Sequence, residues 1–253
     1  MVFEYDTSFP GFLCSCAELF NTGDIIQNSI VKQGTQVELF QDRVTVVRDD
    51  ERSRIFWYRI SKVFSPDYLY KILASFLSDT KDADISLAKY MYKVYKKMLP
   101  QSDVSDYDAM IFESSSKRAT GEAHLYKGMV RFSELYDNTY YAPIKPECNI
   151  LPLIGNHFSV RFNTMKLVIH DVKRSMAILY EPGAKWFIAE NFFLDAKLDD
   201  IISDKEKQIR AMWKLYHTTI AIKERTNLKC QMNFMPRHYW EYITEMTERW
   251  KKI

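Results

Sequence analysis

The hydrophobic positions of this chain change their spacing about halfway along it. In the first half they recur every three or four residues, which predicts amphipathic helices. In the second half, short runs alternate between apolar and polar side chains, which predicts strands, with helices between and after them. Helices mixed with antiparallel hairpins indicate an α+β fold, and we expect it to consist of two sub-domains packed together.

The N-terminal region, residues 1–116, is expected to be mostly helical with one short hairpin. Capping residues mark two helix starts, because Ser8 precedes an apolar row and Ser65 precedes a proline and an acidic residue. The expected elements are a strand over 2–5, helices from Ser8, from Ser65 and from about Asp84 to Pro100, and a hairpin from 37–39 and 44–46. The polar stretch 101–126 is read as a helix or as a connection between the halves.

The C-terminal domain, residues 117–253, is expected to be α+β. Strands are expected over 128–132, 139–144, 166–171 and 176–180. Helices are expected after Pro152, after the capping residue Ser203 and from Pro236. The inward-facing residues of the last helix would be Tyr239, Ile243, Met246 and Trp250. The helix after Ser203 carries an apolar stripe formed by Ile209, Trp213, Tyr216 and Ile220. Core packing is the favoured interpretation for the rings of Trp213, Tyr216 and Trp240, and stacking on nucleic-acid bases is the alternative.

Charge is unevenly distributed along a chain whose net charge is only +2. Residues 1–116 carry 13 lysines and arginines against 17 acidic residues, a balance of −4. Residues 117–203 carry 11 against 10, or +1, and residues 204–253 carry 11 against 6, or +5. A basic end on a neutral body can attract a polyanion, although charge alone favours a solvated helical face.

Several classes of protein are disfavoured by what the sequence lacks. No apolar run approaches the length of a membrane span, and the N-terminus does not resemble a signal peptide, so we expect a cytoplasmic protein. The four cysteines form no C-x-x-C pair, and we read them as reduced thiols. The sequence contains neither a Gly-rich phosphate loop nor a His-Glu-x-x-His motif, so we expect no cofactor and no metal.

One cluster of residues, His170-Asp171-Val172-Lys173-Arg174, could carry chemistry at a predicted strand end. It offers a general base with an orienting acid, or a phosphate clamp made by Lys173 and Arg174. A solvated turn is favoured over catalysis, because no nucleophile is linked to the cluster by spacing, whereas the phosphate contact stays open. His170 and Asp171 are not expected to pair with each other, because neighbours on a strand point to opposite faces. His157 is a further candidate, with a partly buried, hydrogen-bonded histidine as the alternative.

Segments spread over most of the chain resemble a bacterial domain family of unknown function found in proteins labelled "probable DNA metabolism protein". They are Tyr5–Leu13, Lys127–Phe132, Tyr141–Ile144, Asn149–Ile154, His157-Phe158, Arg161-Phe162, Ile169–Arg174, Ile220–Arg225 and Met235–Trp240, whereas residues 20–120 match weakly. The resemblance implies a link to a radical-SAM protein thought to act in DNA modification or repair, and to uracil-DNA-glycosylase-like domains that are sometimes fused to this family. It supplies no catalytic residues. This chain departs from the family at Leu228, where a proline is common, and at Phe234, where a histidine is usual.

These features predict a protein of DNA repair or modification that touches nucleic acid through its C-terminal half. The candidate contacts, as phosphate-positioning cations, are Arg131, Arg161, Lys173, Arg174, Lys223, Arg225 and Arg237. One alternative is a hydrolytic or glycosylase-like enzyme that uses His157, His170 and Asp171. The other is a non-catalytic adaptor whose acidic N-terminal half docks the radical-SAM partner. Whether the protein is an enzyme is left open by the sequence.

Overall fold

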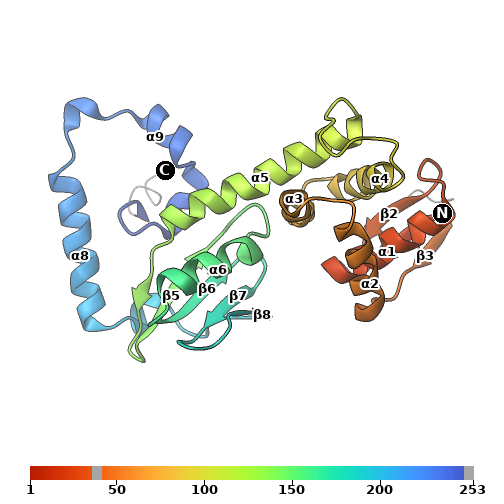
Figure 1. The fold of residues 1–253 in the computed structure, drawn as a ribbon. Coiled ribbons are helices and arrows are strands. Elements are labelled where there is room, and N and C mark those ends of the chain that lie inside the picture. Colours follow the sequence, from red (N-terminus) through yellow and green to blue (C-terminus); the bar gives the residue numbers. More distant parts are fainter. Residues whose placement is uncertain (36–41, 248–253) are drawn as a thin grey trace. The chain divides into compact units, whose positions relative to one another are not determined.

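The computed structural model of the chain describes residues 1–35 and 42–247. The chain forms two compact units, Met1–Thr120 and Gly121–Ile253, and the long helix α5 (Tyr107–Met129) runs through the boundary between them (Figure 1). Both units combine helices with a sheet, which confirms the α+β prediction. Among the described residues, no helix has the length and apolar composition needed to cross a membrane.

The N-terminal unit contains a three-stranded sheet whose pairing is entirely parallel. Its central strand β1 (Val2–Tyr5) lies between β2 (Ser29–Lys32) and β3 (Arg43–Thr45), and α1 (Phe9–Thr22) connects β1 to β2. The expected hairpin was antiparallel, but its second half forms β3, which pairs in parallel with β1. Its first half, 37–39, lies outside the described residues.

The other helices of this unit are α2 (Asp50–Ser61), α3 (Pro66–Phe76), α4 (Ala83–Tyr95) and the first part of α5. The predicted cap is confirmed at Ser8, whose hydroxyl accepts a hydrogen bond from the backbone N–H of Gly11 at 3.0 Å. The expected end of α4 at Pro100 is wrong. The helix stops at Tyr95 because Lys97 has a left-handed backbone (φ 58°), which cannot continue a right-handed helix, and Met98 is exposed.

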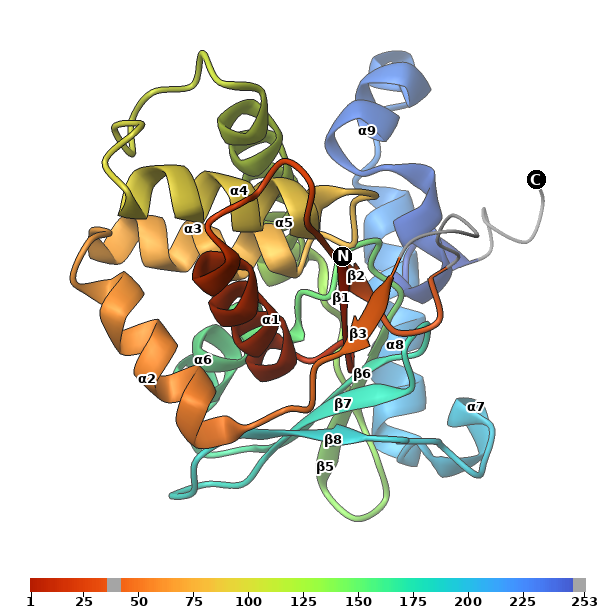
Figure 2. The ribbon, with the colours of Figure 1, turned by 90° about the vertical axis from the view of Figure 1, so that its right-hand side faces the viewer.

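The sheet of the C-terminal unit has five strands in the order β4-β5-β6-β7-β8. Figure 2 labels β5, β6, β7 and β8 of this sheet. The strands are β4 (Ser133–Glu134), β5 (Thr139–Ile144), β6 (Lys166–Asp171), β7 (Met176–Tyr180) and β8 (Phe187–Glu190). Neighbours pair in antiparallel fashion except β5 and β6, which are parallel and are joined by α6 (Leu151–Arg161). The strands predicted over 139–144, 166–171 and 176–180 are confirmed.

The strand predicted over residues 128–132 is wrong, because α5 continues to Met129. The guanidinium of Arg131 folds back and donates hydrogen bonds to the carbonyls of Gly128 and Met129, both at 3.2 Å. A cation at this position satisfies the last carbonyls of the helix and opposes the negative end of its dipole. A residue expected at a strand thus acts as a helix terminator.

Helix α6 packs closely against the indole ring of Trp186, which lies just before β8. A Cβ atom placed on Gly155 would come within 2.8 Å of carbons of that ring. Only glycine therefore allows this approach of the helix to the ring.

Replacement of Gly155 by alanine should lower the unfolding free energy by about 1 kcal/mol net, because overpacking against Trp186 exceeds the gain in helix propensity. The matched control is Gly121→Ala in α5, where nothing lies within 4 Å of the added Cβ, so that variant should be more stable by about 0.5–1 kcal/mol. Urea unfolding of both variants tests the difference. A Gly155→Ala protein as stable as the control would contradict the packing described here.

Candidate functional site

His170 and Asp171 are adjacent on β6 but lie in separate surroundings, as strand geometry predicts. The His170 ring is buried, with Nδ1 2.8 Å from the hydroxyl of Tyr141 and the ring packed edge-on against Phe192 at 5.0 Å. Burial lowers the pKa of His170, and a hydrogen bond with the backbone of Phe192 acts in the opposite direction. His170 is thus held as a neutral, structurally engaged imidazole between β5 and the segment after β8.

The carboxylate of Asp171 is fully buried and is paired with Arg174 at 2.8 Å. The same guanidinium donates hydrogen bonds to the carbonyls of Pro146 at 3.2 Å and Glu147 at 2.6 Å. Burial raises the pKa of Asp171, and the Arg174 charge opposes that rise. Lys173 also reaches the carbonyl of Glu147, at 3.2 Å. The two cations of the predicted phosphate clamp therefore contact the protein's own backbone.

Glu122, on the second part of α5, binds the other side of the same loop. Its buried carboxylate accepts hydrogen bonds from the backbone N–H groups of Glu147 at 2.9 Å and Cys148 at 2.7 Å, and from the hydroxyl of Tyr239 at 2.8 Å. Burial and the charge of Glu122 raise the pKa of Tyr239. Sequence reasoning missed Glu122, because a glutamate in a polar helix is normally a solvent-facing residue.

His157 lies on α6, half-buried, with its ring edge-on to Phe158 at 5.0 Å. Burial lowers its pKa, and the positive charges of Lys127 and Arg161 add to that effect. Within the described chain, no hydrogen bond or ion pair links His157, His170 and Asp171 to one another, and no group of three or more potential ligands is placed to hold a metal ion. The enzyme alternative therefore stays a hypothesis without an assembled set of groups.

The remaining candidate cations differ in their exposure and in whether they form an ion pair. Arg131 pairs with Glu245 at 2.7 Å in addition to terminating α5. Arg161 is exposed at the end of α6 and lies over the ring of Phe162 at 5.7 Å. Arg225 is exposed in the turn η1 (Lys223–Arg225), whereas Arg237 is half-buried, with an Nε that has no hydrogen-bond partner.

Of this set, Arg161, Arg225 and Arg237 have no carboxylate partner within the part of the chain that the structure describes. Lys223 belongs to η1, and its side chain lies outside that part. Among the candidate cations, those without a carboxylate partner in the described residues thus all lie after residue 160.

Helix α8 (Asp204–Thr219) is anchored at its start and exposed along its apolar stripe. The predicted cap is confirmed, since the Ser203 hydroxyl accepts a hydrogen bond from the N–H of Glu206 at 3.1 Å. The Ser203 N–H in turn donates to the carbonyl of Glu134 at 2.9 Å, and a bridge joins Leu135 to Ile202. Glu206 is buried at this junction, which raises its pKa. The base of α8 is thus attached to β4.

Beyond its base, α8 runs along the margin of the C-terminal unit (Figure 1). Its aromatic residues Trp213 and Tyr216 are exposed. Trp213 is 40% exposed and Tyr216 is 55% exposed, and their rings are stacked with centroids 5.8 Å apart. The indole N–H of Trp213 donates to Glu245 at 3.0 Å, which fixes the ring. Core packing was therefore the wrong expectation for these two rings. Ile209 and Ile220, which belong to the same apolar stripe, are also exposed. A helical stripe shows which residues share a face, but not whether another element covers it.

The side chains of the last aromatic segment that were expected to face inward are buried where the structure describes them. Tyr239, Ile243 and Met246 are buried, and Trp240 is only 2% exposed and donates through its indole N–H to the carbonyl of Met235 at 2.9 Å. The helix predicted from Pro236 is a shorter 3₁₀ turn, η2 (Arg237–Tyr242), and Trp250 lies outside the described residues. Between α8 and η2 lies the short helix α9 (Leu228–Phe234), capped by Asn227.

A family model described as a domain of unknown function (DUF4130) matches residues 78–245 of this chain. The match includes α8, η2 and every candidate cation discussed above. Searches of curated proteins and of solved structures gave no match to the chain.

The variant Arg174→Gln should lose about 3 kcal/mol of stability at neutral pH, because the buried Asp171 would lose its cationic partner. Adding Asp171→Asn should recover part of that loss, since the buried charge is then removed as well. Urea unfolding of the two single variants and the double variant measures the coupling, and the exposed Arg161→Gln is the matched control. Equal stability of Arg174→Gln and the control would refute the structural role of Arg174.

The lowered pKa of His170 makes stability depend on pH in a defined direction. The unfolded chain takes up this proton near the ordinary pKa of about 6.5, before the folded protein does. The contribution of the buried His170 to the free energy of unfolding is thus fully present above pH about 6.5. It is lost as the pH falls from there toward the pKa of His170 in the folded protein. Urea unfolding at several pH values should show a smaller decline over this range in His170→Gln than in the wild type. Identical declines would show that His170 is not held neutral by the fold.

Proposed function

This chain belongs to the DUF4130 family, and we propose that it acts in DNA repair or modification by binding single-stranded nucleic acid through its C-terminal unit. The observation that carries the proposal is the exposed, stacked pair of Trp213 and Tyr216 on α8. Large rings are usually buried in a packed protein, so a ring pair in solvent indicates a partner that covers it.

The geometry of the two rings suits a base. Stacking of a base on an aromatic side chain contributes about 1–3 kcal/mol and tolerates any sequence, because every base has a π-face. The bond from Trp213 to Glu245 holds the indole in place before a ligand arrives, so less conformational entropy is lost on binding. Arg131 pairs with the same carboxylate at 2.7 Å, so its role in this proposal is to support the platform rather than to contact phosphate.

The net charge of the sequence segment that carries this platform favours a polyanion. Residues 204–253 have a balance of +5, and Arg225, which follows α8, is exposed without a carboxylate partner in the described chain. We therefore assign phosphate contacts to Arg225, Arg237 and Lys223, with Arg161 as a more distant candidate in sequence. Such cations displace counterions from a phosphate backbone, so affinity should fall with rising salt.

A second candidate function is that of an adaptor, and the apolar residues beside the ring pair favour it. Ile209, Met212 and Leu215 are all exposed on α8, and base stacking does not require them. An exposed apolar helix face is typical of protein docking. The family resemblance implies a radical-SAM protein as the partner, and we propose α8, rather than the acidic N-terminal half, as the surface that would receive it.

Replacing Trp213 and Tyr216 by alanine should weaken binding of a single-stranded oligonucleotide by about tenfold or more, because two stacking surfaces are removed. Arg225→Ala should reduce the slope of log affinity against log salt by about one. Fluorescence anisotropy over a salt series measures both effects. Tyr58→Ala, which removes an exposed ring from the N-terminal unit, is the matched control.

Two outcomes decide between the candidates. Absence of binding by the wild type at low salt would sink the nucleic-acid proposal. If Met212→Asp then abolished co-purification with the radical-SAM protein while Tyr58→Ala did not, the adaptor would take its place.

A further inference from the structure

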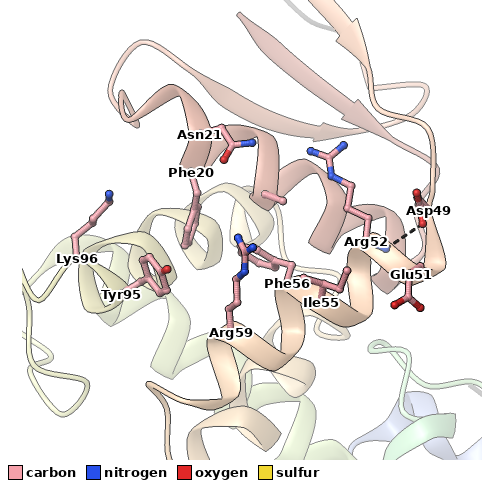
Figure 3. Close-up of a pocket in the computed structure, with 11 residues that line it drawn as sticks. Phe20, Asn21, Asp49, Glu51, Arg52, Ile55, Phe56, Arg59, Tyr95 and Lys96 are labelled. Atoms are coloured by element: carbon pink, nitrogen blue, oxygen red, sulfur yellow. Dashed lines mark hydrogen bonds between the residues drawn. The ribbon is translucent and has the colours of Figure 1, made fainter.

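The N-terminal unit contains a groove of about 480 Å³ between α1 and α2, closed at one end by the last turn of α4 (Figure 3). Its lining comes from the second half of α1, from one face of α2 and from Tyr95 and Lys96. This volume lies within the range of small-ligand sites, which hold molecules the size of a nucleotide. We refer to it as the α1–α2 groove.

The centre of the groove is aromatic. Phe20 contacts Phe56 edge-on with ring centroids 5.1 Å apart, and contacts Tyr95 at 5.6 Å. Phe56 is buried and Tyr95 is exposed, so the rings provide an apolar floor and a wall that a planar ligand can touch. The side-chain amide of Asn21 lies beside Phe20 and can both donate and accept hydrogen bonds (Figure 3).

Some charged groups of the groove have hydrogen-bond or ion-pair partners in the protein, and others have no carboxylate partner in the described residues. At one end, Asp49 accepts the backbone N–H of Arg52 at 3.0 Å, and Glu51 pairs with Arg54 at 3.1 Å. The guanidinium of Arg52 is also engaged, with a carboxylate of α1 at 2.6 Å.

At the other end, Arg59 and Lys96 are exposed and have no carboxylate partner within the described residues. The ammonium of Lys96 lies over the ring of Tyr92 at 5.6 Å, and the guanidinium of Arg59 points into the groove beside Phe56 (Figure 3). The groove lining therefore includes two positive charges, Arg59 beside the aromatic floor and Lys96 beside Tyr95 (Figure 3), in a unit whose sequence is acidic overall.

We propose that the α1–α2 groove binds a nucleoside phosphate. Its phosphate would contact Arg59 and Lys96, its base would lie against Phe20 and Tyr95, and Asn21 would bond the edge of the base. A planar ring combined with an anionic group matches the groove, and guanidinium is well suited to the oxygens of a phosphate. The ligand is either a free nucleotide or the terminal nucleotide of a strand, which share this chemistry. The inference does not depend on the function proposed for α8, because every residue named lies in the N-terminal unit.

The test uses the full chain and isothermal titration with deoxyadenosine 5′-monophosphate, deoxyadenosine and inorganic phosphate. The nucleotide should bind, and the two fragments should bind more weakly, because each fills only one end of the groove. Arg59→Ala and Lys96→Ala should each weaken nucleotide binding by about 10- to 100-fold, as expected for hydrogen bonds to a charged group. Arg54→Ala is the matched control, since Arg54 lies on the same helix but outside the groove.

A second titration with a 5′-phosphorylated tetranucleotide distinguishes the two sources, since a site for strand ends should prefer it to the free nucleotide.

No binding of either probe at about 1 mM, or unchanged affinity in both Arg59→Ala and Lys96→Ala, would overturn the inference. Arg59 also lies in the last turn of α2, where a cation stabilises the helix dipole. If Arg59→Ala lowered the melting temperature but left nucleotide binding unchanged, Arg59 would stabilise α2 without contacting the ligand. The variant lacking Trp213 and Tyr216 should bind the nucleotide like the wild type, which separates the two proposals.

Discussion

The C-terminal unit depends on the way in which the buried carboxylate of Glu122 and the half-buried guanidinium of Arg174 hold the loop between β5 and α6. Glu122 accepts the loop's N–H groups, and Arg174 donates to its carbonyls, so both kinds of backbone group are satisfied without water. Because Glu122 also bonds Tyr239, one carboxylate joins α5, this loop and η2. A backbone loop can be buried only if its polar groups find partners, and here side chains distant in sequence provide them.

That arrangement explains why residues with catalytic potential are occupied elsewhere. Asp171 is needed to neutralise Arg174, and Arg174 is needed by the loop, so neither is available to a ligand. His170 is similarly engaged with Tyr141. On α8 and in the turn that follows it, by contrast, the rings of Trp213 and Tyr216 and the cation Arg225 are exposed. The two proposals place function at the surfaces whose side chains the fold itself does not use.

The two units offer different surfaces. On α8 the rings are open on one side, which suits a long, flexible ligand, whereas the α1–α2 groove is confined and suits a small one. Both present aromatic rings, and cations without a carboxylate partner in the described chain line the groove and follow α8 in sequence. The two proposed ligands are chemically related, since a strand and a nucleotide carry the same base and phosphate groups.

Local signals in the sequence were sufficient for most elements, because capping and alternation act over a few residues. The caps at Ser8 and Ser203 and the strands over 139–144, 166–171 and 176–180 follow from such short-range rules. The same rules failed to predict the end of α5, where the guanidinium of Arg131 turns back and donates a hydrogen bond to the carbonyl of Gly128.

The candidate site shows the same division between sequence and tertiary structure. Helical and strand periodicity are enough to place Trp213 and Tyr216 on one helical face in a basic segment, and to make His170 and Asp171 point apart. Contacts between elements determine that the first pair is exposed, that Arg174 donates hydrogen bonds to a loop, and that Arg59 and Lys96 line the same groove. The reason is physical: periodicity is a property of one element, whereas burial and pairing depend on what other elements place against it.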